Sequence, residues 1–296
     1  MALLSFSAIA VAGREGSRGM TTSELIFWRS VLGALVLAAV YRSHGAGRAA
    51  VATPLLPLHL ARSAVHYCAQ YAWLYALTLI PLTELFALEF TAPLWVAVLA
   101  PIFLRETLTG WRLGAAALGF AGALLVAEPG LLTGTLQLSA SAGTLLAAAS
   151  AVGFATSMLV TKRLTRTEPA MRILFWMQLL QGIIAALLMI GSGLKGGVWP
   201  ASWTGTTPVV IWGWVAVLGI AGLAAHFGLT RAFSLADAII VAPMDFLRLP
   251  LIAVVGAVVY GERLLDNVAI GASVVVVANG LNMWAERRAQ ARLRGT

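Results

Sequence analysis

The sequence is poor in charged residues and in cysteine. Only 11% of the 296 residues are charged, against roughly a quarter in a soluble domain. So low a charge content excludes both a soluble globular domain and an extended disordered chain. The single cysteine, Cys68, excludes an intrachain disulfide and a metal site built from several cysteines.

Enzyme and nucleic-acid motifs are also missing. The sequence has no Gly-x-Ser-x-Gly, no His-Glu-x-x-His and no Walker A motif, and its four histidines are too scattered to predict a ligand cluster. We therefore expect no catalytic site, bound metal or cofactor. The net charge of +8 comes without a nucleic-acid motif, so we expect no nucleic-acid partner. A channel would need a repeated polar filter, which is not seen.

Long apolar segments are abundant instead. Hydrophobic residues make up 60% of the chain, and the mean hydropathy is +0.88. Several segments approach the roughly 20 residues that a helix needs to cross a bilayer, and none alternates as a strand would. We therefore predict an all-α membrane protein with ten transmembrane helices. These spans lie near residues 2–13, 25–41, 60–80, 83–104, 112–127, 143–161, 173–192, 209–228, 239–260 and 267–285.

Basic residues are distributed unevenly over the expected loops. With both termini inside, the inner side carries 14 of the 20 Lys and Arg residues and the outer side 4, while Arg29 and Arg248 lie within spans. Such a bias predicts cytoplasmic termini and a multi-pass protein of the inner (plasma) membrane. The inner set is Arg42, Arg48, Arg62, Arg105, Arg112, Lys162, Arg163, Arg166, Arg172, Arg231, Arg287, Arg288, Arg292 and Arg294.

Three short segments recur in the same order in the second half of the chain. Because each copy would contain five spans, an odd number, the second copy must enter the membrane in the opposite direction. We predict repeats at 1–130 and 141–285, followed by a basic tail at 286–296. We also expect the short first span to lack a turn or two. The matches are Leu25-Ile26-Phe27-Trp28 with Ile173-Leu174-Phe175-Trp176, Ala87-Leu88-Glu89-Phe90 with Pro243-Met244-Asp245-Phe246, and Pro93-Leu94 with Pro250-Leu251.

The chain resembles the EamA-type transporters of the drug/metabolite transporter superfamily. The resemblance covers essentially the whole chain and rests on the two five-helix halves and on three motifs. These are Glu24-Leu25-Ile26-Phe27-Trp28-Arg29, Phe90-Thr91-Ala92-Pro93-Leu94, and Gly261-Glu262-Arg263-Leu264 followed by Gly271. The first repeat departs from the pattern, with Arg105-Glu106 where Gly-Glu is common. The resemblance implies a central cavity and alternating access, with aromatic amino-acid exporters as one branch and flavin importers as another.

Three ionisable residues lie deep within the expected spans. A charge at this depth is costly, so Glu89, Asp245 and Arg248 are candidates for the substrate site. We hypothesise that Arg248 binds an anionic group such as an α-carboxylate, while Glu89 or Asp245 binds an ammonium or carries a coupling proton. The alternative is a structural bridge from Arg248 to Glu89 or to Asp245 that locks two helices together.

Span three carries a polar stripe. His66, Gln70 and Trp73 share one helix face, which we expect to line the cavity, with Trp73 stacking on a planar substrate. Helix–helix hydrogen bonding is the alternative. Trp95 is a further site candidate, with core packing as its alternative.

Other polar residues in the spans are expected to have structural roles. Arg29, near the outer end of its span, ranks below Arg248 as a site candidate, and its alternative is to pair with Glu24 or Glu84 or to extend to the membrane surface. Residues Gln178, Gln181 and His226 are expected to form helix–helix contacts, with a cavity lining as the second choice.

Together these features predict a secondary-active transporter of small metabolites. An acid and a base near the mid-plane, with indoles nearby, favour outward transport of aromatic or neutral amino acids. A carrier of flavins, nucleosides or drug-like molecules is the alternative, and an intramembrane enzyme a distant one. We expect a small-molecule substrate and the bilayer as partners, with protons as a candidate coupling ion. The sequence leaves the oligomeric state and the direction of transport open.

Overall fold

The computed structural model describes most of the chain. The described residues are 2–45, 50–80, 82–105, 110–127, 141–196 and 207–248, together with 270, 271, 273, 274, 276–278, 280, 281 and 284. Much of the spans expected near 239–260 and 267–285 lies outside them, as do the Gly261-Glu262-Arg263-Leu264 motif and the tail at 286–296.

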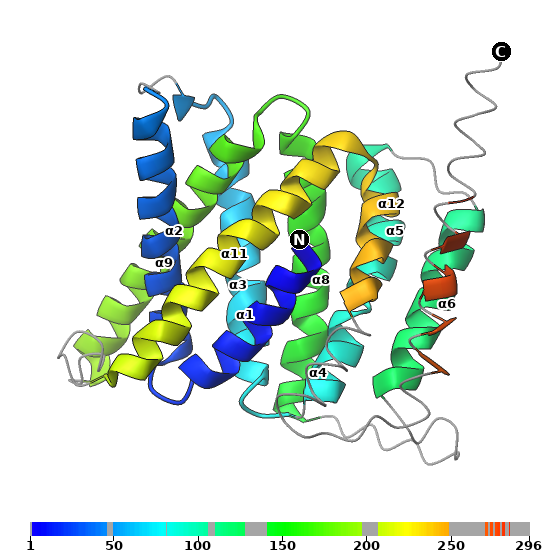
Figure 1. The fold of residues 1–296 in the computed structure, drawn as a ribbon, viewed down its shortest axis with the longest axis horizontal. Helices are drawn as coiled ribbons and strands as arrows, with labels where there is room; N and C mark the ends of the chain where they lie inside the picture. Colours follow the sequence, from blue (N-terminus) through cyan, green and yellow to red (C-terminus); the bar gives the residue numbers. More distant parts are fainter. Residues whose placement is uncertain are drawn as a thin grey trace.

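All regular elements of the described residues are helical. They are α1 (Ala2–Gly16), α2 (Thr22–Ser43), α3 (Leu56–Ala76), α4 (Leu82–Glu89), α5 (Ala92–Leu104), α6 (Gly110–Ala127), α8 (Ala142–Leu164), α9 (Ala170–Gly196), α11 (Val209–Leu235), α12 (Ala238–Val241) and the 3-10 helix η2 (Ala242–Leu247). Figure 1 shows a bundle in which α1 and α11 run diagonally across the more upright α3 and α8.

The composition of the helices is that of a membrane protein. Among the described residues, four helical segments are long and apolar enough to cross a bilayer: Thr22–Ser43, Ala142–Leu164, Ala170–Ser192 and Val209–Leu235. Large apolar side chains also cover the outside of the bundle, where water would disfavour so extended a patch. Examples with at least 60% exposure are Leu35, Ile102, Leu145, Leu187 and Ile220. The prediction of an all-helical membrane protein with several apolar spans is confirmed.

Local sequence determines where α2 begins. Thr21 caps this helix, because its hydroxyl accepts from the backbone N–H of Glu24, while the Glu24 carboxylate accepts from the Thr21 N–H at 2.8 Å. This reciprocal capping box satisfies two donors that a helix start leaves without partners. Glu24 is thus a helix cap, and Arg29 does not pair with it.

The span expected at 83–104 is broken near its middle. Helix α4 ends at Glu89, and α5 begins at Ala92 with Pro93 in its first turn. A proline has no N–H to donate and cannot continue a preceding helix, so it favours a break at this position. The segment that the predicted repeat matches to this one is irregular as well, because Asp245 lies in the 3-10 helix η2.

The core lies between the two halves of the chain. Helices α1, α2 and α3 pack mainly against α11, α9 and α8, respectively. Small residues allow the close approach: a Cβ atom added to Gly33 of α2 would lie 1.8 Å from Nε2 of Gln178 on α9. Gln178 is therefore a helix–helix contact, as expected. On α8, a Cβ added to Gly153 would lie 2.8 Å from the Cβ of Ala69 on α3.

This contact generates a stability prediction. We expect Gly153→Ala to lower the melting temperature of the purified protein, because overpacking a tight contact costs about 1–3 kcal/mol. The matched control is Gly213→Ala on α11, where an added Cβ meets no atom within 4 Å. A helical alanine should leave stability there unchanged or raise it. Equal melting temperatures of the two variants in detergent would contradict the close α3–α8 contact.

Candidate functional site

A cavity within the bundle is lined by both halves of the chain. The first half contributes side chains from α1, α2, α3, α4 and α5, and the second from α8, α11, η2 and residue 248. Six of the seven predicted site residues line it: His66, Gln70, Trp73, Glu89, Asp245 and Arg248. The structure thus brings together residues that are up to 182 positions apart in the sequence.

Arg248 forms the centre of an ion-pair network in this cavity. Its Nη2 lies 2.5 Å from Oε1 of Glu89 and 3.2 Å from Oδ2 of Asp245. The indole Nε1 of Trp73 donates to the other carboxylate oxygen of Glu89 at 2.7 Å. The arrangement is the bridge that the sequence left as the alternative. Two carboxylates neutralise Arg248, so its charge is not free for a substrate anion in this conformation.

Aromatic rings surround the network. The guanidinium carbon of Arg248 lies 5.2 Å from the ring centres of Phe6 and Phe90 and 5.6 Å from that of Phe86. These distances are within the range of cation–π attraction. The rings also keep water away from the ion pair, since Arg248 is 3% exposed and Glu89 is 9% exposed.

His66 and Gln70 line the cavity from α3. The Nδ1 of His66 lies 3.1 Å from the hydroxyl of Ser157 on α8, and its ring meets that of His226 edge-on at 4.9 Å between centroids. His66 therefore both contacts α8 through a hydrogen bond and lines the cavity. His226 also lines the cavity, which was the alternative role expected for it.

Trp95 does not belong to this group. Its side chain is 42% exposed and lies on the outer face of α5 with Val98 and Ile102. The buried face of α5 includes Ala92, Val96 and Ala100, which pack against α8 and α12. The expectation that Trp95 lines the site or packs in the core is therefore wrong, because its depth in a span does not determine which way it points.

Two further arginines line the cavity: Arg29, which the sequence ranked below Arg248, and Arg62, which it did not single out. Arg29 on α2 is 2% exposed, and its Nη2 donates to Oε1 of Gln181 on α9 at 2.7 Å. Arg62 on α3 is 3% exposed, and its Nε donates to the hydroxyl of Thr161 on α8 at 2.8 Å. Both line the cavity. Arg62 could have been found, since it lies one turn before His66 on the polar stripe of α3.

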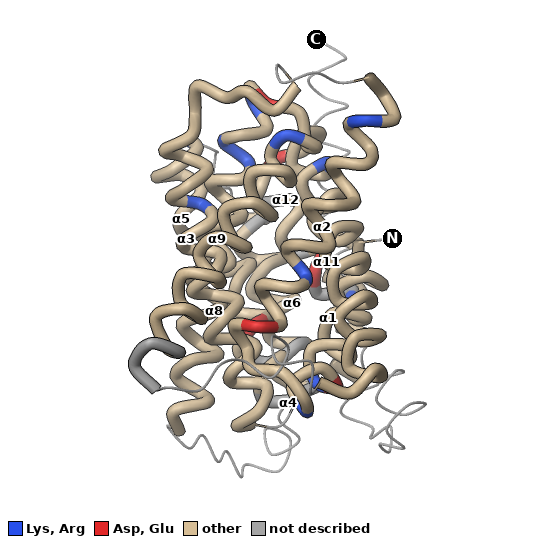
Figure 2. Tube along the Cα trace, turned by 90° about the vertical axis from the view of Figure 1, so that its left-hand side faces the viewer, with Lys and Arg blue, Asp and Glu red and all other residues tan. Residues whose placement is uncertain are grey.

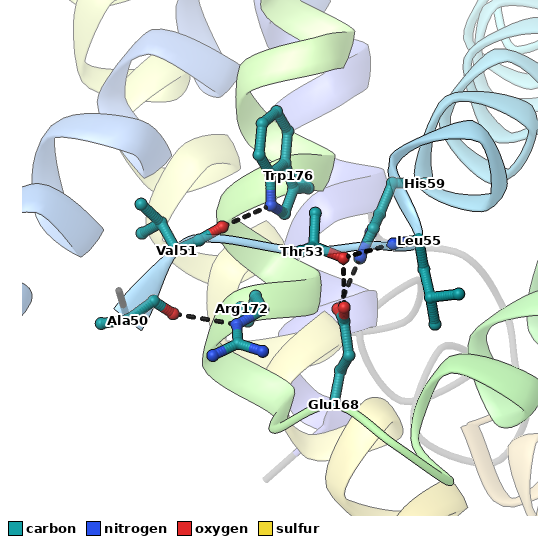
Figure 3. Close-up of polar contacts among 8 residues, drawn as sticks. All are labelled: Ala50, Val51, Thr53, Leu55, His59, Glu168, Arg172 and Trp176. Atoms are coloured by element: carbon teal, nitrogen blue, oxygen red, sulfur yellow. Dashed lines mark hydrogen bonds and ion pairs between the residues drawn. The ribbon is translucent and has the colours of Figure 1, made fainter. Parts of the chain in front are cut away.

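A second polar cluster lies where the α2–α3 connection meets α9 and the segment before it. There the carboxylate of Glu168 accepts from the hydroxyl of Thr53 and lies 2.6 Å from Nε2 of His59 (Figure 3). The side chains of Arg172 and Trp176 donate to the backbone oxygens of residues 50 and 51, each at 2.9 Å. These bonds tie the α2–α3 connection to α9 and to the segment that precedes it.

Comparisons with known proteins identify the family. Residues 1–127 match the EamA-like transporter family. A riboflavin transporter of Brucella anthropi is 32% identical over 277 residues, which are 93% of each chain. The chain belongs to the EamA-like transporter family.

Further comparisons agree with this membership. An S-adenosylmethionine uptake transporter of Rickettsia felis is 23% identical over 99% of this chain and 93% of that protein. A crystal structure at 20% identity superposes with a TM-score of 0.77 over 97% of this chain and 96% of the other, and so shares the fold. This EamA protein is a multi-pass transporter of small metabolites and not an enzyme. Neither named relative is an aromatic amino-acid exporter.

The network around Arg248 generates a second prediction. We expect Arg248→Leu to lower the stability by about 3–5 kcal/mol, because two carboxylates remain buried without their cation. The double variant Arg248→Leu with Glu89→Gln should recover part of this loss. A double-mutant cycle of thermal unfolding in detergent measures the coupling, and Arg231→Leu on the exposed surface is the control. Strictly additive effects would contradict the bridge.

Proposed function

We propose that this protein is a secondary-active carrier of a planar heteroaromatic metabolite, a flavin or a nucleoside-containing compound. The observation that carries the proposal is the 32% identity over 93% of both chains with a protein named as a riboflavin transporter. The cavity is compatible with such a cargo. Rings of Phe6, Trp73 and Phe154 offer apolar faces, while Gln70 and Ser157 offer polar groups for the edges of a heterocycle.

Amino-acid export becomes the second candidate. The sequence argument for a zwitterionic cargo depended on Arg248 as the acceptor of its carboxylate. Because Glu89 and Asp245 occupy Arg248, this part of the argument is weaker. The names of the relatives likewise favour flavins and nucleoside-containing compounds.

The proposed architecture is ten helices in two inverted repeats, 1–130 and 141–285, with a basic tail at 286–296. Its support is a reciprocal packing pattern. Under the repeat, α1 corresponds to α8 and α3 corresponds to α11. Helix α1 packs on α11, and α3 packs on α8. Replacing each helix of the first pair by its equivalent in the other half gives the second pair. A two-fold relation between the halves produces such reciprocity.

Alternating access would act on the contacts between these halves. We assign the proposed substrate site to His66, Gln70, Trp73, Glu89, Asp245 and Arg248, which face one cavity from both halves. Glu89 and Asp245 are also the candidate sites of a coupling proton. Separation of the halves on one side would require the Glu89–Arg248 pair to move apart or to be replaced by contacts with cargo.

Both termini are proposed to be cytoplasmic, in the inner membrane. Figure 2 supports this orientation, because most Lys and Arg positions lie at one end of the bundle. The α2–α3 and α8–α9 connections lie at that end, and basic residues are retained on the cytoplasmic side of membranes.

The orientation predicts a labelling pattern. In a Cys68→Ser background, we expect Thr167→Cys in the α8–α9 connection to resist a membrane-impermeant maleimide in intact cells. Ser17→Cys in the α1–α2 connection should react. Lysed cells, in which both sites are accessible, are the control. The reverse pattern would place the termini outside.

The cargo assignment predicts saturable exchange of riboflavin. In proteoliposomes, we expect counterflow of radiolabelled riboflavin, inhibited by an excess of unlabelled flavin. Trp73→Leu should raise the apparent KM about tenfold, because a stacked base on an aromatic ring is worth roughly 1–3 kcal/mol. The matched control is Trp95→Leu on the outer surface, which should retain the wild-type KM. Exchange of tryptophan without exchange of riboflavin would overturn the assignment and support amino-acid transport.

A further inference from the structure

The charges that line the cavity do not balance. Three arginines and two carboxylates face it, and both carboxylates bind Arg248. Within the described ranges, neither Arg29 nor Arg62 has a carboxylate at ion-pair distance. Glu168, an acidic side chain outside the cavity, is held by Thr53 and His59 (Figure 3).

Arg29 and Arg62 retain unused hydrogen-bonding capacity. Each donates to a neutral side-chain oxygen, Gln181 for Arg29 and Thr161 for Arg62, which leaves the charge uncompensated. In the described part of the chain, Nε of Arg29 and Nη1 of Arg62 have no acceptor, although both atoms are buried. Burial of a guanidinium without an anion is unfavourable, so an anionic partner would stabilise the site.

Packing holds both guanidiniums at the cavity. Gly222 of α11 makes room for Arg29, since a Cβ added there would lie 3.1 Å from its Nη1. Two side chains of the second half of the chain orient these guanidiniums: Gln181 on α9 accepts from Arg29, and Thr161 on α8 accepts from Arg62. The arginines themselves come from the first half, so both halves build the pair.

We propose that Arg29 and Arg62 form an anion subsite of the cavity, which binds the carboxylate or phosphate of the transported metabolite. A guanidinium fork matches either oxyanion with two parallel hydrogen bonds. This inference rests on the proposed function and refines it. Riboflavin carries no such group, so the favoured cargo is a heteroaromatic compound that does, such as a flavin phosphate or a nucleoside-containing amino acid.

Small anions test the subsite without any assumption about the cargo. The purified protein is unfolded thermally in phosphate, acetate or chloride at equal ionic strength. We expect phosphate or acetate to raise the melting temperature of the wild type, since a ligand of the folded state stabilises it. Stabilisation by phosphate assigns a phosphate group, and stabilisation by acetate assigns a carboxylate.

Variants localise the effect. Arg62→Gln and Arg29→Gln should each weaken the apparent anion affinity about tenfold. Arg163→Gln, on the exposed face of α8, is the matched control and should keep it. If a glutamine variant does not fold, Arg62→Lys retains the charge but not the fork and should give an intermediate affinity. Equal melting temperatures of the wild type in all three salts, or an unchanged shift in Arg62→Gln, would overturn the subsite.

A matched pair of flavins connects the subsite to transport. Riboflavin and riboflavin 5′-phosphate, which differ only in the phosphate group, compete in the counterflow assay. We expect the phosphate ester to compete about tenfold better in the wild type and to lose this advantage in Arg62→Gln, with riboflavin unaffected. Equal competition in the wild type would overturn the assignment of the subsite to a phosphorylated flavin and leave the flavin carrier standing. Stabilisation by small anions without exchange of either flavin would overturn the flavin as the cargo and support the subsite.

Discussion

An ion pair in apolar surroundings connects the two halves of this transporter. Glu89 and Arg248 are 159 residues apart, and both are at least 90% buried. At the low effective dielectric of such a site, either partner alone would be a buried charge, so separation without replacement is costly. Trp73 and three phenylalanine rings hold this pair in place. Relative movement of the halves is therefore limited by what can take the place of this contact.

The backbone is irregular at the positions of both carboxylates. Glu89 ends α4 just before Pro93 opens α5, and Asp245 lies in a 3-10 segment instead of an α-helix. Helix interruptions at membrane depth are tolerated where they line a cavity, since exposed backbone groups can find polar partners there. The interruptions and the ionisable side chains thus support each other, because each would be unfavourable in a continuous lipid-facing helix.

Much of this arrangement could be predicted from the sequence, because the cost of burying charge and the length of a span are local properties. They were sufficient for the helical class and for placing Glu89, Asp245 and Arg248 at one depth. The side of a helix that faces the core depends on its packing partners. Trp95 was expected to point inward, but the small residues of α5 pack inward and the indole lies outside. Arg62 lies only two residues inside the predicted span at 60–80, so it was counted with the inner loops and the adjoining span ends. Its partner Thr161 lies 99 residues away, and no local pattern predicts such a pairing.

The charge pattern of the cavity follows from which partners each arginine has. Arg248 with its two carboxylates has a formal charge of −1, whereas Arg29 and Arg62 together have +2. An anionic cargo would balance the second group without disturbing the first, whereas a cation would have to compete with Arg248 for Glu89. Because Thr161 and Gln181 orient the two free guanidiniums from the other half of the chain, an anion bound there would also contact the boundary between the halves. A ligand shifts the equilibrium between two arrangements of the halves only if it binds one arrangement more tightly than the other. The uncompensated arginines are therefore better suited to couple cargo binding to the movement of the halves than the neutralised Arg248.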